Sequence, residues 1–201
     1  MRTLEPILND YRRVGFDLDG TLVDTSGVIL SGLECACDAI GIAAQVNISL
    51  VGPSLDEICE ILSIDRSKRD LFKSTFIRFH DDNIGLTDLT FTGAKSLLET
   101  LRMRDHTIFL ITNKRRRPTE IILKNSSIFE FFDQIYCSDD FDLGSEFKAV
   151  ILKNIKMLDT KHRFIYVGDH ENDQIAAFRA GVNFVWVSQG EVKRYSTCQF
   201  S

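Results

Sequence analysis

The chain of 201 residues carries 24 basic and 29 acidic side chains, which gives a net charge of −5. This length leaves room for one full core and a smaller additional unit, and a hydrophobic content of 44% with 26% charged residues is typical of a soluble globular protein. The negative charge gives no reason to expect binding to nucleic acid or a membrane surface, and no apolar run approaches the length that spans a bilayer.

The cysteines and the N-terminal segment both favour a cytoplasmic location. The cysteines are odd in number and lack the paired spacing of a zinc site, which favours reduced, packed thiols. They are Cys35, Cys37, Cys59, Cys137 and Cys198. Charged residues such as Glu5 and Asp10 interrupt the N-terminal segment, so it is not a signal peptide. We expect a cytoplasmic enzyme or binding protein, and the sequence leaves its oligomeric state open.

The first predicted strand follows a polar lead-in of residues 1–12, which can include a short helix. Val14–Phe16 is a short apolar run, and Gly20-Thr21 then stops it, as expected where a buried strand ends in a sharp turn. Between them stand two carboxylates, Asp17 and Asp19. Two like charges this close stay ionised only beside a cation, and otherwise one of them holds a proton. The pattern therefore suits either an acidic surface turn or a site for metal, nucleophile and proton transfer.

The next part of the chain is predicted to be helical. Apolar side chains recur at three- and four-residue steps, and Ser54 stands where a capping residue opens a helix. The predicted helices cover residues 28–40, 54–62 and 65–79. Because residues 25–90 show no strand pattern, we predict that they form an all-helical insertion after the first strand.

From residue 91 onward, apolar strands alternate with helices. The predicted strands are 107–112, 134–137, 164–169 and, as the final one, 184–187. The predicted helices are 93–104, 118–125, 146–157 and one that ends at residue 180. This alternation predicts βαβ units and a parallel sheet covered on both faces. The expected fold is therefore α/β, with a Rossmann-like core of residues 1–24 and 91–201 and a helical domain of residues 25–90.

Polar residues directly follow three of the apolar strands. They are Asp17 with Asp19, Thr112 with Asn113, and Asp169 with Asp173. In an open parallel sheet, ligands bind at the carboxyl ends of the strands, so these side chains are expected to converge. The helix dipole explains one acidic residue after a strand, but it does not explain four carboxylates at one sheet edge. Such a cluster needs a cation, and carboxylate oxygens with waters are the ligands that Mg²⁺ prefers.

Neutral and basic residues near these strand ends suit a phosphate group. Thr112 and Asn113 can donate hydrogen bonds to a phosphoryl oxygen. Lys148, at the start of a predicted helix, can add a fixed positive charge, although a surface lysine is the simpler interpretation of that residue alone. The basic run Lys114–Arg117 is more typical of a solvated helix face or an anion-attracting rim than of a nucleic-acid site.

Taken together, these motifs resemble the haloacid dehalogenase-like superfamily. That superfamily has DxDGT, then a Thr or Ser after a second strand, then a Lys, and then GDxxxD. The matching segments here are Asp17–Thr21, Ile111–Asn113, Lys148 and Gly168–Asp173, in the same order. The resemblance spans the core from Val14 to Val187.

Further features look like the phosphoglycolate-phosphatase type within that superfamily. These are Thr-Asn-Lys at 112–114, the GDxxND form of the last motif, and an all-helical cap after the first strand. One departure is Ala149, which replaces the proline that often follows the motif lysine. The helical region has the length of a family cap but contains no decisive substrate motif.

The resemblance implies a set of roles for the motif residues. Asp17 would attack phosphorus and form an aspartyl-phosphate, while Asp19 would protonate the leaving alcohol and then deprotonate water. The implied Mg²⁺ site consists of Asp17, Asp19 through its backbone carbonyl, Asp169 and Asp173. The implied phosphoryl-binding residues are Thr112, Asn113 and Lys148, and Lys148 also supports catalysis. Asp24 is expected to bond the loop that enters the cap, and His170 to face solvent.

The expected activity is Mg²⁺-dependent hydrolysis of a small phosphorylated metabolite, such as a phosphoglycolate-like compound or a sugar phosphate. The Gly52-Pro53-Ser54 turn and the Arg115–Arg117 rim are expected to help choose it. Asp19 argues against a dehalogenase, which needs no acid for a leaving alcohol. A phosphonate hydrolase would need a cap lysine, and nothing marks Lys68 or Lys73 as that group. A phosphomutase shares every core residue and stays open, as does a non-catalytic phosphate-sensing protein on the same fold.

Overall fold

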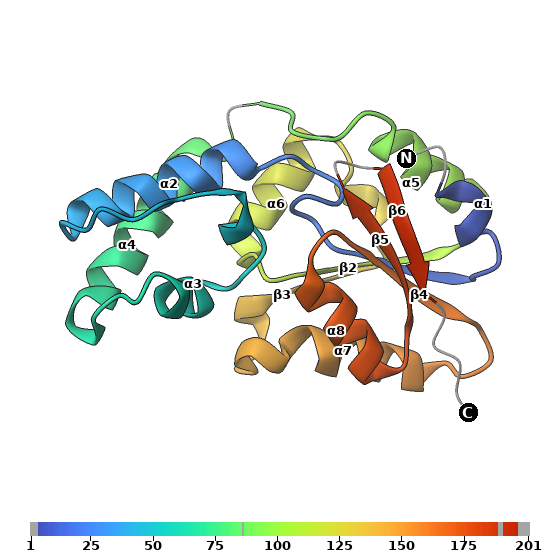
Figure 1. Cartoon of the computed structure of the whole chain (residues 1–201). Coiled ribbons are helices and arrows are strands. Elements are labelled where there is room, and N and C mark those ends of the chain that lie inside the picture. The colour runs from blue at the N-terminus through green and yellow to red at the C-terminus, as the bar shows by residue number, and fades with distance from the viewer. Residues whose placement is uncertain (1–3, 86, 189–190, 197–201) are drawn as a thin grey trace.

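A six-stranded sheet forms the centre of the molecule, for which a computed structural model describes residues 4–85, 87–188 and 191–196 (Figure 1). The strands are β1 (Arg13–Phe16), β2 (Thr107–Thr112), β3 (Gln134–Cys137), β4 (Phe164–Gly168), β5 (Asn183–Ser188) and β6 (Glu191–Ser196). Their order is β3-β2-β1-β4-β5-β6, and every neighbouring pair is parallel except β5 with β6. The strand order reverses at β1, which places the carboxyl end of β1 at the switch point where such sheets bind ligands.

Helices cover both faces of the sheet. On one face lie α1 (Glu5–Leu8), α5 (Ala94–Met103) and α6 (Arg116–Asn125), and on the other lie α7 (Phe147–Leu158) and α8 (Glu171–Ala180) (Figure 1). Alternate residues of β2 show why both faces are needed: Ile108 and Leu110 belong to the first core, while Phe109 and Ile111 belong to the second. A strand that is apolar at consecutive positions must be covered on both sides. The α/β fold is therefore confirmed.

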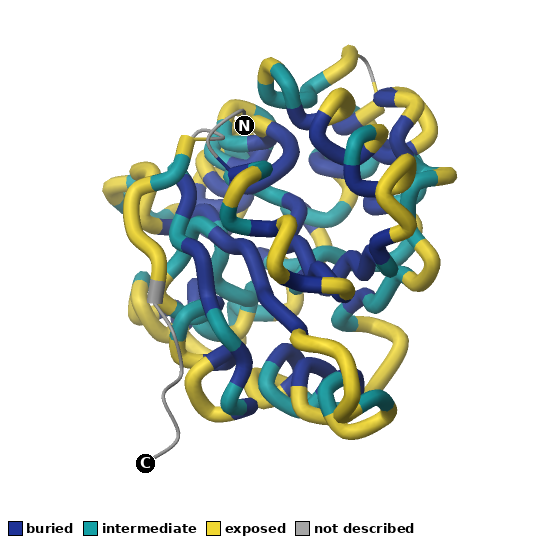
Figure 2. The backbone as a smooth tube through the Cα atoms, turned by 90° about the vertical axis from the view of Figure 1, so that its right-hand side faces the viewer, coloured by how far each residue is buried: buried dark blue, intermediate teal, exposed yellow. Residues whose placement is uncertain are grey.

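Three further helices lie to one side of the sheet and form a unit with its own core. They are α2 (Ser26–Ala39), α3 (Leu55–Ile61) and α4 (Arg66–Asn83), with a short 3₁₀ turn at Ile48–Leu50 (Figure 1). Leu33, Ile58 and Phe72 are among the buried side chains of this core. Ser54 caps the N-terminus of α3, as predicted, and forms a capping box with Glu57. Figure 2 shows how the buried stretches of the chain gather inside these layers while the loops between them stay exposed.

The chain leaves the sheet for this helical unit and returns to it at one place. Val23 and Thr90 form an antiparallel bridge. The backbone N–H of Asp24 donates to Leu89 at 2.8 Å, and that of Phe91 donates to Leu22 at 3.0 Å. The two connections thus run side by side, so the helical unit is tied to the core right after the turn that follows β1.

The structure differs from the sequence-based expectation at both ends of the chain. Residues 184–187 do not form the last strand, because β6 follows and pairs antiparallel with β5. The lead-in was predicted to be polar, but three of its side chains, Leu4, Leu8 and Tyr11, are buried and belong to the first core. The hydroxyls of Tyr11 and Tyr195 bond one another, which joins the lead-in to β6.

The structure bears on the cysteines and on membrane-spanning segments only within its described residues. Four cysteines are free thiols there (Cys35, Cys37, Cys59 and Cys137), and Cys198 lies outside the described residues. None of the helices that the structure describes is both long and apolar enough to cross a membrane.

Candidate active site

The site is built on the first residue after β1. The backbone N–H of Asp17 donates to the carbonyl of Val167 in β4 at 2.9 Å. This bond extends the parallel pairing by one residue and holds the Asp17 backbone in place. The Asp17 side chain is only 6% exposed. A charged side chain this deeply buried is found almost only where other groups compensate it.

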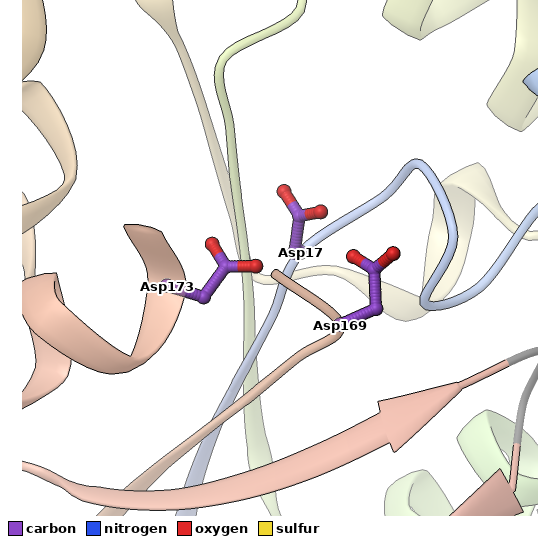
Figure 3. Close-up of side chains that lie close together, drawn as sticks. All are labelled: Asp17, Asp169 and Asp173. Atoms are coloured by element: carbon purple, nitrogen blue, oxygen red, sulfur yellow. The ribbon is translucent and has the colours of Figure 1, made fainter. Parts of the chain in front are cut away.

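Two more carboxylates come from the neighbouring strand and helix. Asp169 follows β4 directly, and Asp173 stands in the first turn of α8 (Figure 3). Oxygens of Asp17, Asp169 and Asp173 all lie within 4.8 Å of one another. In Figure 3 the Asp17 and Asp169 side chains point to the same side, and Asp173 approaches them from α8. The predicted convergence of these three residues is therefore present.

Lys148 is the cation inside this cluster. It stands in the first turn of α7, and its Nζ donates to Asp17 Oδ1 at 2.7 Å and to Asp173 Oδ1 at 2.5 Å. The other oxygen of Asp173 accepts from the backbone N–H of His170 at 3.2 Å, which closes a capping box at the start of α8. Both oxygens of Asp173 thus accept hydrogen bonds, one from Lys148 and one from the start of α8.

The charges of the cluster do not balance. When all three carboxylates are ionised, they exceed the one ammonium by two negative charges, and Asp17 and Asp173 are buried. Burial, and then the charge of Asp173, raises the pKa of Asp169 to about 7. Burial also raises the pKa of Asp17 well above its usual range, although Lys148 opposes this. Burial alone would lower the pKa of Lys148, but the two carboxylates raise it. The cluster therefore suits a divalent cation, which would balance the excess charge.

Asp19 lies beside the cluster but its carboxylate faces the helical unit. Its Oδ1 accepts from the hydroxyl of Thr25, and its Oδ2 lies 3.2 Å from Lys114 Nζ. The two aspartates of the DxD motif therefore contact different groups. Asp17 faces the lysine and the other carboxylates, whereas Asp19 faces groups that lead into the residue 25–90 insertion.

The two residues that follow β2 occupy different positions. Thr112 is buried, and its Oγ1 accepts from the backbone N–H of Lys114 at 3.1 Å. Asn113 reaches across to the helical unit, where its side-chain amide donates to the carbonyl of Gly52 at 3.3 Å. Asn113 thus connects the sheet edge to the Gly52-Pro53-Ser54 turn.

A cavity of about 850 Å³ opens between the sheet edge and the helical unit. From the core it is lined by Asp19, Asn113, Lys114, Arg115 and Lys148, and from the helical unit by Gly52, Ser54, Phe76 and His80, among others. The cavity thus reaches from solvent to the residues around Asp17. Its size is that of a small-molecule site rather than of a groove for a polymer.

Parts of the basic run and of the last motif are placed differently from the prediction. Arg115 lines the cavity, as expected for the predicted rim. Arg116 instead binds Asp140 at 2.6 Å and the carbonyl of Ile135 at 2.7 Å, so it contacts β3 and the turn after it. His170 does not face solvent freely. It is half-buried, and a Cβ on Gly52 would lie 3.1 Å from its ring, so the Gly52-Pro53-Ser54 turn packs against it. Asp24 accepts from the backbone N–H of Ser26 at 3.2 Å, where the chain enters the helical unit.

Four residues with clear contacts to the site were not predicted as site residues from the sequence. Thr25 and Lys114 hold Asp19, His80 holds Lys114, and the hydroxyl of Tyr166 donates to Ile111 at 2.9 Å and lies 3.4 Å from Asp173. Only Lys114 had a local signal, because it directly follows Thr112 and Asn113. The others reach the site through tertiary packing.

Gly20 makes the approach of the β1 loop to Asp169 possible. Its φ is +75°, and a Cβ there would lie 1.9 Å from an Asp169 carboxylate oxygen. We expect Gly20→Ala to cost about 1–2 kcal/mol from the left-handed backbone alone, and to displace Asp169 and lower turnover at least about a hundredfold. Urea unfolding and initial rates measure the two effects. Gly27→Ala in α2, where nothing lies within 4 Å, is the control and should be neutral or stabilising. Normal activity in Gly20→Ala would contradict this account of the loop.

Comparisons with known proteins agree with this architecture. The family described as haloacid dehalogenase-like hydrolase matches residues 14–187. Pyrophosphatase PpaX of Bacillus cereus is 26% identical over 177 residues, which cover 86% of this chain and 81% of that protein. A haloacid dehalogenase-like family protein from Streptococcus pneumoniae has a similar structure, with a TM-score of 0.76, 22% identity, and coverage of 91% of this chain and 88% of that one. The structure of a protein named as a predicted phosphoglycolate phosphatase from Haemophilus somnus gives a TM-score of 0.73 at 21% identity, covering 90% and 87%.

Proposed function

The chain belongs to the haloacid dehalogenase-like hydrolases, and on this basis we propose that it is a Mg²⁺-dependent phosphatase of small phosphorylated metabolites. The observation that carries the proposal is the position of Asp17. It is a buried carboxylate that faces a buried lysine beside the cavity. A carboxylate held this way can attack phosphorus and form an aspartyl-phosphate.

The side chains around Asp17 support distinct parts of the reaction. Lys148 holds the Asp17 carboxylate at 2.7 Å and would neutralise charge that develops on the phosphoryl oxygens. Thr112 and Asn113, at the end of β2, would donate hydrogen bonds to the same oxygens. Asp19 would protonate the leaving alcohol and then remove a proton from the water that hydrolyses the intermediate. In this scheme one aspartate carries the phosphoryl group and the other carries the proton.

The carboxylates also support a magnesium site. Asp17, Asp169 and the backbone carbonyl of Asp19 would hold the ion, with Asp173 acting through Lys148, since both of its oxygens already accept hydrogen bonds. The excess of two negative charges described above matches a divalent cation, and oxygen ligands suit a hard one. Bound Mg²⁺ would bring the phosphate close to Asp17 against their mutual repulsion.

The helical unit is proposed to act as a cap of residues 25–90. Its Gly52-Pro53-Ser54 turn, together with Phe76 and His80, lines the cavity opposite the sheet edge. A cover of this kind excludes water from the reaction and restricts the substrate to a small molecule. Arg115 is the member of the predicted basic rim that lines the cavity, so it is the one we expect to contact substrate.

The candidate substrates are small phosphate compounds. The similarity to proteins named pyrophosphatase PpaX supports inorganic pyrophosphate as a second candidate beside phosphoglycolate-like compounds and sugar phosphates. A phosphomutase would use the same core residues. The test measures phosphate release from a panel that contains pyrophosphate, 2-phosphoglycolate and several sugar phosphates. Phosphate release would support the proposed phosphatase, whereas isomerisation of a sugar phosphate without phosphate release would overturn it in favour of a phosphomutase.

Metal dependence gives a specific prediction about pH. We expect no turnover in excess chelator and recovery on adding Mg²⁺, with Ca²⁺ a poor substitute because its looser coordination misplaces the nucleophile. The pKa of Asp169 is raised to about 7 by burial and the charge of Asp173. Protons therefore compete with the metal below that pH, and Mg²⁺ affinity should fall by up to about tenfold per pH step of one.

This pH dependence can be measured without activity. The Mg²⁺-induced rise in melting temperature is titrated at pH values on both sides of 7. Asp169→Asn is the matched variant, because it removes the titrating group and one ligand while keeping the shape of the side chain. It should bind Mg²⁺ weakly at every pH. Full turnover in chelator, or Mg²⁺ affinity that is equal at about pH 5.5 and pH 8, would refute the metal assignment.

A further inference from the structure

A chain of buried polar contacts joins the cap helix α4 to Asp19. His80, near the end of α4, has its Nε2 at 3.0 Å from Lys114 Nζ, and the same Nζ lies 3.2 Å from Asp19 Oδ2. The side chains are 3%, 7% and 12% exposed, respectively. His80 and Asp19 come from different units of the fold, so Lys114 is the connecting group between them.

The chemistry of the three groups sets the direction of the hydrogen bonds. An ammonium has only donors, so Lys114 donates both to Asp19 and to Nε2 of His80. His80 must then be neutral, with its proton on Nδ1. Burial, and then the charge of Lys114, lowers the pKa of His80 to about 4, which keeps it neutral near pH 7. His80 is therefore an acceptor that holds the lysine ammonium at the end of a long flexible side chain.

A second contact lies beside the first. Arg115 binds Asp81 at 2.6 Å, so two consecutive residues of α4 bind two consecutive residues after β2. Asp81 Oδ1 also lies 3.8 Å from Nδ1 of His80, on the side where the neutral ring carries its proton. Only the His80–Lys114 contact continues to Asp19. A contact between the two units that stands apart from this chain is the hydrogen bond from the Asn125 side-chain amide to the carbonyl of Gly85 at 2.8 Å.

We propose that His80 and Lys114 are positioning residues for Asp19, through which the cap helix controls the proton-transfer step. This inference rests on the proposed function, in which Asp19 is the acid and base. Asp19 is held at both oxygens, by the Thr25 hydroxyl at Oδ1 and by Lys114 at Oδ2. Without His80, Lys114 loses one of its two buried partners and gains freedom to turn, so the carboxylate is no longer fixed in one orientation.

The leaving group distinguishes this role from simple attachment of the cap. An aryl phosphate such as 4-nitrophenyl phosphate leaves readily without an acid, whereas an alkyl phosphate needs its oxygen protonated. Loss of Asp19 positioning should therefore slow aspartyl-enzyme formation with the alkyl substrate much more than with the aryl one. A loosened cap would slow both, or raise KM for both.

The experiment compares three variants with wild type by rapid quench on an alkyl substrate found in the panel and on 4-nitrophenyl phosphate. His80→Phe removes the acceptor but keeps a ring against Phe76, which His80 stacks on at 5.6 Å. We expect it to lose about tenfold or more of the formation rate with the alkyl substrate and under about threefold with the aryl one, with little change in KM. His80→Gln, which keeps an acceptor, should recover most of the rate. Asn125→Ala, which removes only the separate hydrogen bond to Gly85, should show no preference between the two substrates.

The outcomes separate this inference from the proposed function. Asp19→Asn is measured in parallel and should show the same leaving-group preference in stronger form. If wild type hydrolyses no phosphate ester, or if Asp19→Asn slows both substrates equally, the proposed roles themselves fail. If Asp19→Asn shows the preference but His80→Phe slows both substrates equally, the positioning role is wrong. Lys114→Met tests the same link from the core side should His80→Phe fail to fold, and an equal loss on both substrates there overturns it too.

Discussion

Asp17→Asn is expected to abolish turnover with every phosphate ester, aryl or alkyl. The carboxamide cannot attack phosphorus, and it also removes a charged oxygen from the proposed metal site. Removal of a nucleophile from an enzyme of this kind costs on the order of 10⁴- to 10⁶-fold in rate. The loss should be the same for all substrates, because in the proposed mechanism each one forms the aspartyl-phosphate. Initial rates with 4-nitrophenyl phosphate and with the best alkyl substrate give the measurement.

The same variant should remain folded, which makes its inactivity informative. Burial raises the pKa of Asp17 well above its usual range, so the ionised carboxylate is costly to the fold. Asparagine has the same shape without that charge, and Lys148 keeps Asp173 as a partner at 2.5 Å. We expect an unchanged or higher melting temperature without metal. Residual turnover above about one part in a hundred, in protein shown free of wild type, would exclude Asp17 as the nucleophile.

Much of the fold was predictable because its signals are local. Apolar runs such as Ile108–Ile111 need cover on both faces, and each is followed at once by polar residues. Parallel strands bring their carboxyl ends to one edge, so Asp17, Asp169 and Asp173 could be expected together before any coordinates were known. Lys148 is different. Its position in the first turn of a helix is more typical of a surface lysine, and only the motif order suggested otherwise.

The features that escaped prediction depend on contacts far apart in the chain. Strand β6 carries three charged residues among its six, and an edge strand of this kind lacks the apolar pattern that marks a strand in the sequence. His80 lies 34 residues from Lys114, and nothing in the α4 pattern distinguishes it from a histidine packed in a core. Both cases have one cause: the partner that gives the residue its role is supplied by tertiary structure.

Replacement of Lys148 by methionine should destabilise the protein strongly, in addition to stopping catalysis. Methionine keeps a long apolar side chain, so the packing of α7 is largely retained. Asp17 and Asp173 lose the only ammonium that contacts them in the described structure. Removing one partner of a buried ion pair costs about 3–5 kcal/mol, because the remaining charge is left without compensation. Urea unfolding of the metal-free protein near pH 8 measures this cost.

The dependence of this loss on pH identifies its cause. Lys148 opposes the rise in the Asp17 pKa, so its removal raises that pKa further. A carboxyl whose pKa is higher in the folded than in the unfolded state costs stability as the pH rises through that interval. The Lys148→Met deficit should therefore be small near pH 4, where Asp17 is protonated in the fold, and largest above pH 7. Asp17→Asn in the same background should recover much of it. An equal deficit at both pH values would instead assign the effect to lost packing, since apolar contacts do not titrate.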